Sequence, residues 1–189
     1  MLFHRDVSCL LVIDVQQYFL DKLPRDQRVP LVARIVWLMR VAHALEIPII
    51  ATAEDIAQNG SPVPELIARL PEGRPVFDKM VFGLYDQPDI RAAIEASGRT
   101  EFVLVGLETD VCVAHSALGL AAAGYRVAVL EDGCGSPPPH HAAGLGRLRD
   151  AGVMVTTIKG LYYEWLRDLE TLARVKAAIG SALPSGLTL

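Results

Sequence analysis

The chain has 189 residues and a formal net charge of −4 at pH 7, and 51% of its residues are hydrophobic. Because it carries no cluster of basic residues, it lacks the electrostatic pattern of a nucleic-acid-binding protein. No apolar run reaches the roughly 20 residues that a membrane span requires, so we expect no membrane partner. The length fits one domain, which we place at residues 1–180, followed by a tail at 181–189.

Short aliphatic runs alternate along the chain with Ala-, Leu- and Arg-rich stretches at helical spacing. The runs predict strands at Cys9–Ile13, Ile47–Ala51, Pro75–Phe77, Phe102–Val105, Arg126–Leu130 and Val153–Thr157. The stretches predict helices at Val29–Leu45, Pro64–Leu70, Pro88–Ala96, Cys112–Ala123, Pro138–Ala151 and Tyr162–Ile179. Between Glu54 and Pro75 the chain is rich in Pro and Gly, which predicts irregular structure around one short helix.

This alternation predicts right-handed βαβ units and a three-layer α/β sandwich, a doubly wound parallel sheet with helices on both faces. A sheet buried on both faces accounts for much of the apolar composition. The remainder indicates a subunit interface, so we expect a homo-oligomer, with the aromatic helix start at Tyr162, Tyr163 and Trp165 as a candidate contact. Alternatively, these aromatic residues pack on the sheet of their own subunit.

The sequence lacks the motifs of several cofactor-dependent classes. The first strand runs into Asp14 without a GxGxxG turn, and the chain contains no GxxxxGK[ST], so we expect no nucleotide cofactor. The five histidines are scattered, and we predict no metal site. The three cysteines lack CxxC or Cys/His zinc spacing, which fits a reducing, cytoplasmic setting.

Cys112 follows an apolar run and a glycine turn in the stretch VLVGLETDVCV, and it enters an Ala-rich helix. A thiol at that place lies beside unpaired backbone N–H groups and the positive end of the helix dipole, both of which favour a thiolate. The end of a strand in an open parallel sheet is also where such folds bind ligands. Cys112 is therefore a candidate nucleophile, although a small buried core residue is an equally good interpretation of this stretch alone.

Two further residues have charges in apolar surroundings. Asp14 ends the first strand, which in a doubly wound sheet neighbours Phe102–Val105 and so brings Asp14 to the same edge as Cys112. Lys79 stands among apolar residues in FDKMVF. A carboxylate that caps a turn and a solvated loop lysine are the ordinary alternatives for these two positions.

Taken together, LLVIDVQQYF with Asp14, KMVFGLYD with Lys79 and VGLETDVCVAHSAL with Cys112 resemble the isochorismatase-like cysteine hydrolase superfamily in order and context. The resemblance extends from about Ser8 to Leu169 and implies a six-stranded parallel sheet of order 3-2-1-4-5-6. It further implies an Asp14–Lys79–Cys112 triad and a non-proline cis peptide at about Leu107–Glu108. The oxyanion donors would be the backbone N–H groups of Glu108 and Cys112.

This resemblance leads to a mechanistic hypothesis. Asp14 accepts the thiol proton of Cys112, Lys79 lowers the thiol pKa, and the sulfur attacks the carbonyl carbon of a small amide or other C–N substrate to form a thioester. The segment ATAEDIAQNGSPVPEL lacks the metal-binding histidines of nicotinamidases, so nicotinamide is not implied as the substrate. A catalytically silent binding or scaffold protein of the same fold is the alternative. A redox pair of Cys112 with Cys134 is a third possibility.

Several residues flank the proposed site, and each is equally compatible with simple packing. The candidates for the substrate pocket are Gln16, Phe19, Phe82 and Tyr85. Thr52 and Glu54 end the second strand and are further candidates to face the cleft, whereas Asp110 is expected to cap the cysteine helix and His115 to pack on it. Cys9 is predicted to be a core residue, and Cys134 to lie in a loop, where it is more reactive.

Overall fold

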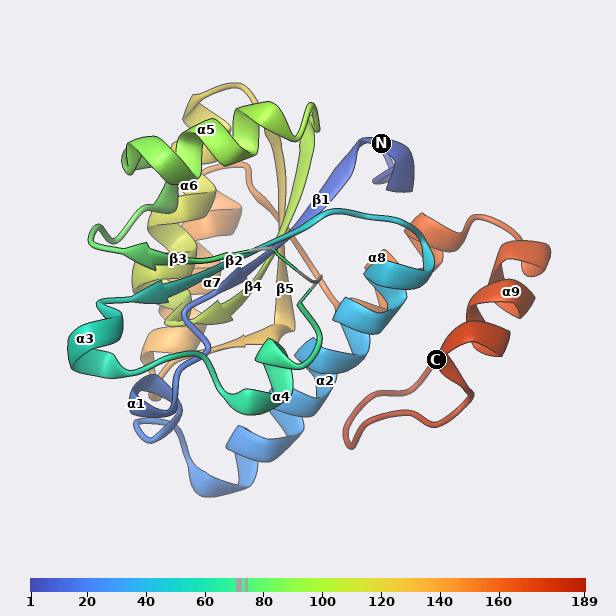
Figure 1. Ribbon diagram of the computed structural model, residues 1–189, viewed down its shortest axis with the longest axis horizontal. Coiled ribbons are helices and arrows are strands. Elements are labelled where there is room, and N and C mark those ends of the chain that lie inside the picture. Colours follow the sequence, from blue (N-terminus) through green and yellow to red (C-terminus); the bar gives the residue numbers. More distant parts are fainter. Residues whose placement is uncertain (71–72, 74) are drawn as a thin grey trace.

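The computed structural model describes residues 1–70, 73 and 75–189. Its strands form one parallel sheet in the order β3-β2-β1-β4-β5-β6 (Figure 1). The strands are β1 (Ser8–Ile13), β2 (Ile49–Glu54), β3 (Val76–Lys79), β4 (Glu101–Leu107), β5 (Arg126–Gly135) and β6 (Met154–Thr156). The α/β fold and the strand order that the resemblance implied are therefore confirmed.

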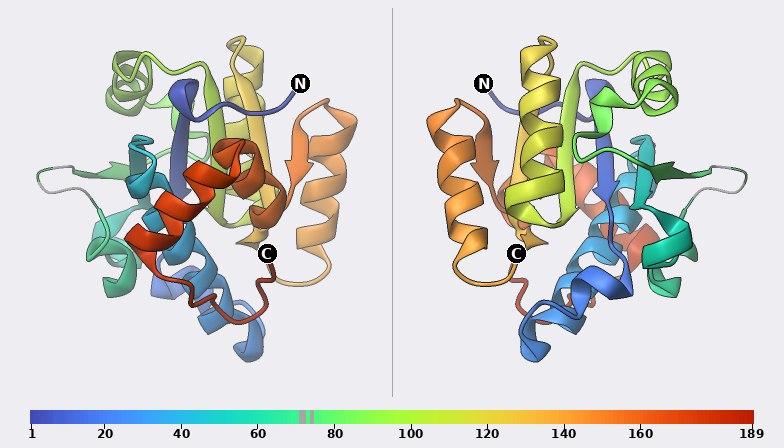
Figure 2. Two further views of the ribbon diagram at one scale, coloured as in Figure 1. Left: turned by 90° about the vertical axis from the view of Figure 1, so that its right-hand side faces the viewer. Right: turned by 90° about the vertical axis from the view of Figure 1, so that its left-hand side faces the viewer.

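Helices cover both faces of the sheet. One face carries α2 (Arg25–Ala44), α8 (Ile158–Leu166) and α9 (Leu169–Ile179), and the other carries α5 (Pro88–Ala96), α6 (Ala114–Ala122) and α7 (His140–Asp150) (Figure 2). Three short helices lie beside the strand ends, at α1 (Gln17–Leu20), α3 (Ile56–Asn59) and α4 (Pro64–Ile67). Among the described residues, no helix has the length and apolar content to cross a membrane.

Every residue of β1 and β4 is buried, because these adjacent strands lie at the centre of the sheet. Leu10 and Val12 contribute to the core on the α2 side, whereas Cys9, Leu11 and Ile13 contribute to the core on the α6 side. The alternation follows the two-residue period of a strand. It also confirms the prediction that Cys9 is a core residue.

The site is set up at the boundary between β1 and β4, where the strand order reverses. From β1 the chain proceeds outward to β2 and β3, and from β4 it proceeds the other way to β5 and β6, so the loops after β1 and β4 diverge. Gly106 brings the two strands together there, because a Cβ at this position would lie 2.0 Å from the carbonyl oxygen of Ile13. Its φ of +129° also lies where glycine is favoured.

The single final helix expected at Tyr162–Ile179 is wrong. The chain forms two helices, α8 and α9, because Arg167 has a φ of 68° and the side chain of Asp168 accepts a hydrogen bond from Thr171 N at the start of α9. Tyr162 and Trp165 are buried within the subunit, where the Trp165 indole donates to Ser8 Oγ at 3.1 Å. These two residues therefore pack within their own subunit, whereas Tyr163 is 45% exposed and stays a candidate contact.

Most other predicted boundaries shift by a few residues, and two differences are larger. The fifth strand extends past a register shift at Leu104/Gly106 to Gly135, so Cys134 lies in β5 and is buried, not in a loop. In the segment predicted to be irregular, α3 forms before α4, while positions 71, 72 and 74 lie outside the described residues.

Candidate active site

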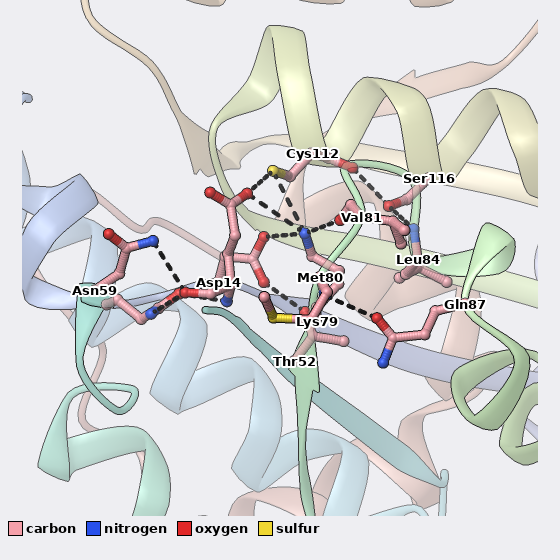
Figure 3. A network of polar contacts seen from close by, with 12 residues as sticks. Asp14, Thr52, Asn59, Lys79, Met80, Val81, Leu84, Gln87, Cys112 and Ser116 are labelled. Carbon is pink, nitrogen blue, oxygen red and sulfur yellow. Dashed lines mark hydrogen bonds and ion pairs between the residues drawn. The ribbon is translucent and has the colours of Figure 1, made fainter. Parts of the chain in front are cut away.

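Four side chains from four strand ends meet at one point of the sheet edge (Figure 3). Asp14 follows β1, Glu54 and Lys79 end β2 and β3, and Cys112 lies in the π-helical turn η3 (Thr109–Val113) that follows β4. Glu54 and Lys79 are register partners in the sheet, so their side chains leave the strands side by side. The structure thus brings the three residues of the predicted triad together and adds Glu54 to them.

Asp14 is fully buried, with a backbone φ of 50° that turns the chain directly after β1. Its Oδ1 accepts a hydrogen bond of 2.7 Å from the Thr52 hydroxyl, and its Oδ2 lies 3.0 Å from Lys79 Nζ. Burial raises the pKa of Asp14, and the opposing effects of Lys79 and Thr52 only reduce that rise. Both carboxylate oxygens therefore already have protein partners.

Lys79 is also fully buried, which is rare for a lysine unless it is paired. Its ammonium donates to the Val81 carbonyl at 2.6 Å and lies 3.0 Å from Asp14 Oδ2, 3.5 Å from Glu54 Oε2 and 3.7 Å from Cys112 Sγ (Figure 3). Burial alone would lower the pKa of Lys79, but the neighbouring acidic groups outweigh it and raise the pKa. Lys79 is therefore the cationic centre of the cluster.

Cys112 is 2% exposed, and its thiol donates to Glu54 Oε2 at 3.0 Å. Burial raises the pKa of the thiol, the charge of Asp14 raises it further, and Lys79 only partly offsets both effects. The expected effect of Lys79 on the thiol is therefore present in direction, but burial and Asp14 outweigh it, so the net pKa of Cys112 lies above its ordinary value. The thiol hydrogen bond of 3.0 Å goes to Glu54, and a weaker hydrogen-bond interaction of the thiol with Asp14 slightly lowers the pKa of Asp14.

The turn that carries Cys112 is held by residues on either side of it. The predicted cis peptide at Leu107–Glu108 is present, and the Glu108 carbonyl accepts hydrogen bonds from Val111 N at 3.2 Å and Val113 N at 3.1 Å. At the α7 side, the Thr109 hydroxyl is 2.8 Å from His141 Nδ1. These contacts hold the start of the η3 turn in place against the end of β4 and the start of α7.

Asp110 does not cap the cysteine helix. Its Oδ1 instead accepts a hydrogen bond of 2.7 Å from the hydroxyl of Ser136, which follows β5. Gly144 of α7 lies so close that a Cβ there would be 2.7 Å from the Asp110 Cα. Asp110 therefore ties the turn to β5 and α7.

The four candidate pocket residues lie in different surroundings. Gln16 is fully buried and its carboxamide is occupied by the backbone of Glu54 and Gly60, while Phe19 is buried in the core on the α2 side. The Tyr85 hydroxyl donates to Glu95, 3.2 Å away on α5. Phe82 is 57% exposed and contacts the exposed His115 edge to face. Of these four described residues, only Gln16 forms side-chain hydrogen bonds to one of the four clustered residues, Glu54.

Sequence reasoning assigned Glu54 no chemical role. The only signal was its position at the end of the second strand, next to Thr52. Its contact with Cys112 depends on the pairing of β2 with β3 and on the loop geometry after β1, neither of which has a local sequence motif.

The oxygen and sulfur atoms of Asp14, Glu54 and Cys112 lie within 4.8 Å of one another, a spacing that can hold a metal ion. Lys79 Nζ, however, is within 3.7 Å of an atom of each of the three. A metal cation at their centre would be repelled by this buried ammonium. The chemistry of the donor set with Lys79 in place therefore fits a proton-transfer site better than a metal site.

The 3-2-1-4-5-6 order and the buried residues at its switch point define a doubly wound α/β protein with a polar site, and comparisons with known proteins identify its family. The isochorismatase domain model matches residues 8–160, and the chain belongs to this family of hydrolases. The chain is 30% identical over 175 residues to isochorismatase family protein 2B of Dictyostelium discoideum, covering 86% of this chain and 78% of that protein.

Two solved structures share the fold. YcaC from Pseudomonas aeruginosa, determined with hexane-2,5-diol and covalent acrylamide, has a TM-score of 0.86 and 24% identity, with 95% of this chain and 90% of that chain covered. YcaC from Escherichia coli, described as an octameric hydrolase of unknown specificity, has a TM-score of 0.84 and 24% identity, with 95% and 91% covered.

Proposed function

We propose that this protein is a cysteine-dependent hydrolase that cleaves the C–N bond of a small amide or carbamoyl compound. The observation that carries the proposal is the buried contact of Cys112 Sγ with the Lys79 ammonium, 3.7 Å away, beside the carboxylates of Asp14 and Glu54. A nucleophile, a cation and acid–base groups within one cluster are the components that acyl transfer requires.

In the proposed reaction the Cys112 sulfur attacks the carbonyl carbon, and the carbonyl oxygen becomes an oxyanion bound by the backbone N–H groups of Glu108 and Cys112. Loss of one such donor typically costs about 10²–10³ in rate. The C–N bond then breaks, the amine leaves with a proton, and water hydrolyses the thioester. Lys79 keeps a positive charge beside the sulfur throughout, and Asp14 holds that ammonium in place.

The covalent acrylamide in YcaC from P. aeruginosa supports the proposal, because it shows that a protein of this fold can be modified by a small electrophilic amide. We therefore choose acrylamide as the first probe. Intact mass and peptide mapping should show one adduct on Cys112, with Cys9 and Cys134 as buried internal controls. A small-amide screen of wild type and Cys112→Ala follows. Turnover that survives Cys112→Ala would overturn the proposal, and labelling without turnover of any amide would favour the silent binding protein.

We further propose a cytoplasmic homo-oligomer. No disulfide joins the described cysteines, which fits a reducing compartment. The octameric state of E. coli YcaC supports assembly, as do Met80 and Phe82, which follow Lys79 and are 65% and 57% exposed. Light scattering at micromolar concentration tests the assembly, and a monomer would contradict it.

A further inference from the structure

Two carboxylates face the same thiol, and the hydrogen bond of the thiol to Glu54 is the stronger of the two interactions. Glu54 Oε2 accepts the Cys112 hydrogen bond at 3.0 Å. Asp14, by contrast, has Thr52 on one oxygen and Lys79 on the other. Because a proton moves along an existing hydrogen bond, the geometry favours Glu54 over Asp14 as the acceptor.

The two carboxylates also differ in their access to water. The Asp14 side chain is completely buried, whereas the Glu54 side chain is 20% exposed. No donor among the described residues bonds to Glu54 Oε1, so this oxygen is available to a substrate or to water. A group that must meet a leaving amine and later a water molecule needs this access.

Glu54 is held in position through its backbone. The carboxamide of Gln16 accepts from Glu54 N at 2.7 Å and donates to the Glu54 carbonyl at 2.8 Å, and Asn59 Nδ2 donates to the same carbonyl at 3.1 Å. Gln16 also donates to the Gly60 carbonyl at 2.7 Å. The side chain of Glu54 is thus free to exchange protons while its backbone stays fixed.

We propose that Glu54 is a catalytic residue that carries the proton between Cys112, the leaving amine and water, and that Asp14 instead positions Lys79. The proposal rests on the proposed cysteine hydrolase function. Gln16 is then a positioning residue for Glu54, which assigns it a role other than substrate contact.

The steps balance as follows. The S–C bond forms as the π electron pair of the carbonyl group moves to its oxygen, and the thiol proton moves to Glu54 Oε2. The carbonyl then re-forms, the C–N bond breaks, and its electron pair takes the proton from Glu54, so a neutral amine leaves. Water next attacks the thioester while Glu54 accepts a water proton. The C–S bond breaks, and the sulfur recovers that proton to regenerate the thiol.

A pair of matched probes tests this assignment, p-nitrophenyl acetate and p-nitroacetanilide, which share an acyl group and differ in the leaving atom. p-Nitrophenolate leaves without a proton, whereas the aniline needs one. In the first turnover, Glu54→Gln should slow both probes, because the acceptor of the thiol proton is lost, and should slow the anilide by a further factor of about 10²–10⁴, because the aniline also loses its proton donor. Asp14→Asn should slow both probes alike. Glu65→Gln, which removes an exposed carboxylate on α4, is the charge-matched control.

The opposite pattern overturns the proposal. If Asp14→Asn lost more rate with the anilide than with the ester, and Glu54→Gln lost the same rate with both, Asp14 would be the residue that carries the proton. Glu54→Asp should recover part of the anilide rate, which a loss of folding would not allow. If Cys112→Ala retained both reactions, the proposed function itself would fail, and this outcome is distinct from failure at Glu54.

A second measurement needs no substrate recognition. Iodoacetamide alkylation of Cys112 is followed against pH by peptide mapping, with Asp14, Glu54 and Lys79 as the charged groups that face the sulfur. Removal of the Glu54 charge should shift the alkylation midpoint of Glu54→Gln to lower pH than wild type. Coincident profiles would show that Glu54 does not hold the thiol proton and would overturn the assignment.

Discussion

Cys112 and Cys134 are two buried thiols on neighbouring parts of one sheet, yet their surroundings differ in kind. Cys134, in β5, faces a backbone carbonyl, that of Leu104 at 3.8 Å, and burial raises its pKa to about 12. Cys112 contacts a carboxylate at 3.0 Å and an ammonium at 3.7 Å. The comparison indicates that burial alone keeps a thiol protonated and unreactive. A buried thiol can act as a nucleophile only where neighbouring charged groups accept its proton.

The largest expected difference between the two thiols is in turnover. Cys112→Ala should reduce hydrolysis of a small amide by at least about 10⁴-fold, because the nucleophile is lost. Cys134→Ala should leave the rate unchanged. Steady-state rates on an amide found by screening measure both variants, and equal effects of the two substitutions would contradict the distinction.

The buried ammonium of Lys79 is the main difference between the surroundings of Cys112 and those of Cys134. Lys79→Met leaves Asp14 buried without its partner, so the unfolding free energy should fall by about 3–5 kcal/mol, as measured by chemical denaturation. Alkylation of Cys112 should also slow, because Lys79 lowers the thiol pKa. Asp14→Asn added to Lys79→Met should restore part of the stability. Lys159→Met, at an exposed position on α8, is the matched control and should change neither quantity.

Gly106, in β4, lies between the strands β1 and β5. It is paired with Ile13 on one side and with Cys134 on the other. Gly106→Ala should lower the unfolding free energy by about 3 kcal/mol, because the added Cβ would overlap the Ile13 carbonyl. Gly146→Ala, in α7 with open space at its Cβ, should instead stabilise by about 0.5–1 kcal/mol. Denaturation midpoints check both substitutions, and a neutral Gly106→Ala would contradict the close approach of β1 and β4.

The smallest effect is the pH dependence that Cys134 contributes. Its pKa is raised from 9.0 to about 12 by burial, so between these values the unfolded thiol has ionised while the folded thiol is still protonated. The native state then binds more protons, and the contribution of Cys134 to stability falls as pH rises, up to tenfold in the folding equilibrium per pH unit. Stability measured at pH 8 to 11 should therefore fall less steeply in Cys134→Ala. Parallel curves for the two proteins would contradict the raised pKa.

Much of the fold could be predicted because its signals are local. The apolar runs of β1 and β4 and the glycine turn before Cys112 each stand in consecutive residues, and they led to the parallel sheet and to Asp14 and Cys112, whereas Lys79 was added by the family resemblance. Glu54 could not be assigned its contact, since this depends on strand pairing and on the distant carboxamide of Gln16. The extension of β5 to Cys134 and the break at Arg167 likewise depend on a register shift and a single backbone angle.

The pairing of β3 with β2 has a consequence for folding fidelity. Lys79 points into the cluster, and the preceding Asp78 is exposed on the other side of the strand, where its carboxylate accepts from Ile56 N at 2.9 Å. A slip of one residue would exchange the two side chains and bury Asp78 beside Asp14 and Glu54. Three carboxylates would then repel one another without a counter-ion. The charges of the candidate site therefore also disfavour the wrong alignment of β3, an edge strand only four residues long.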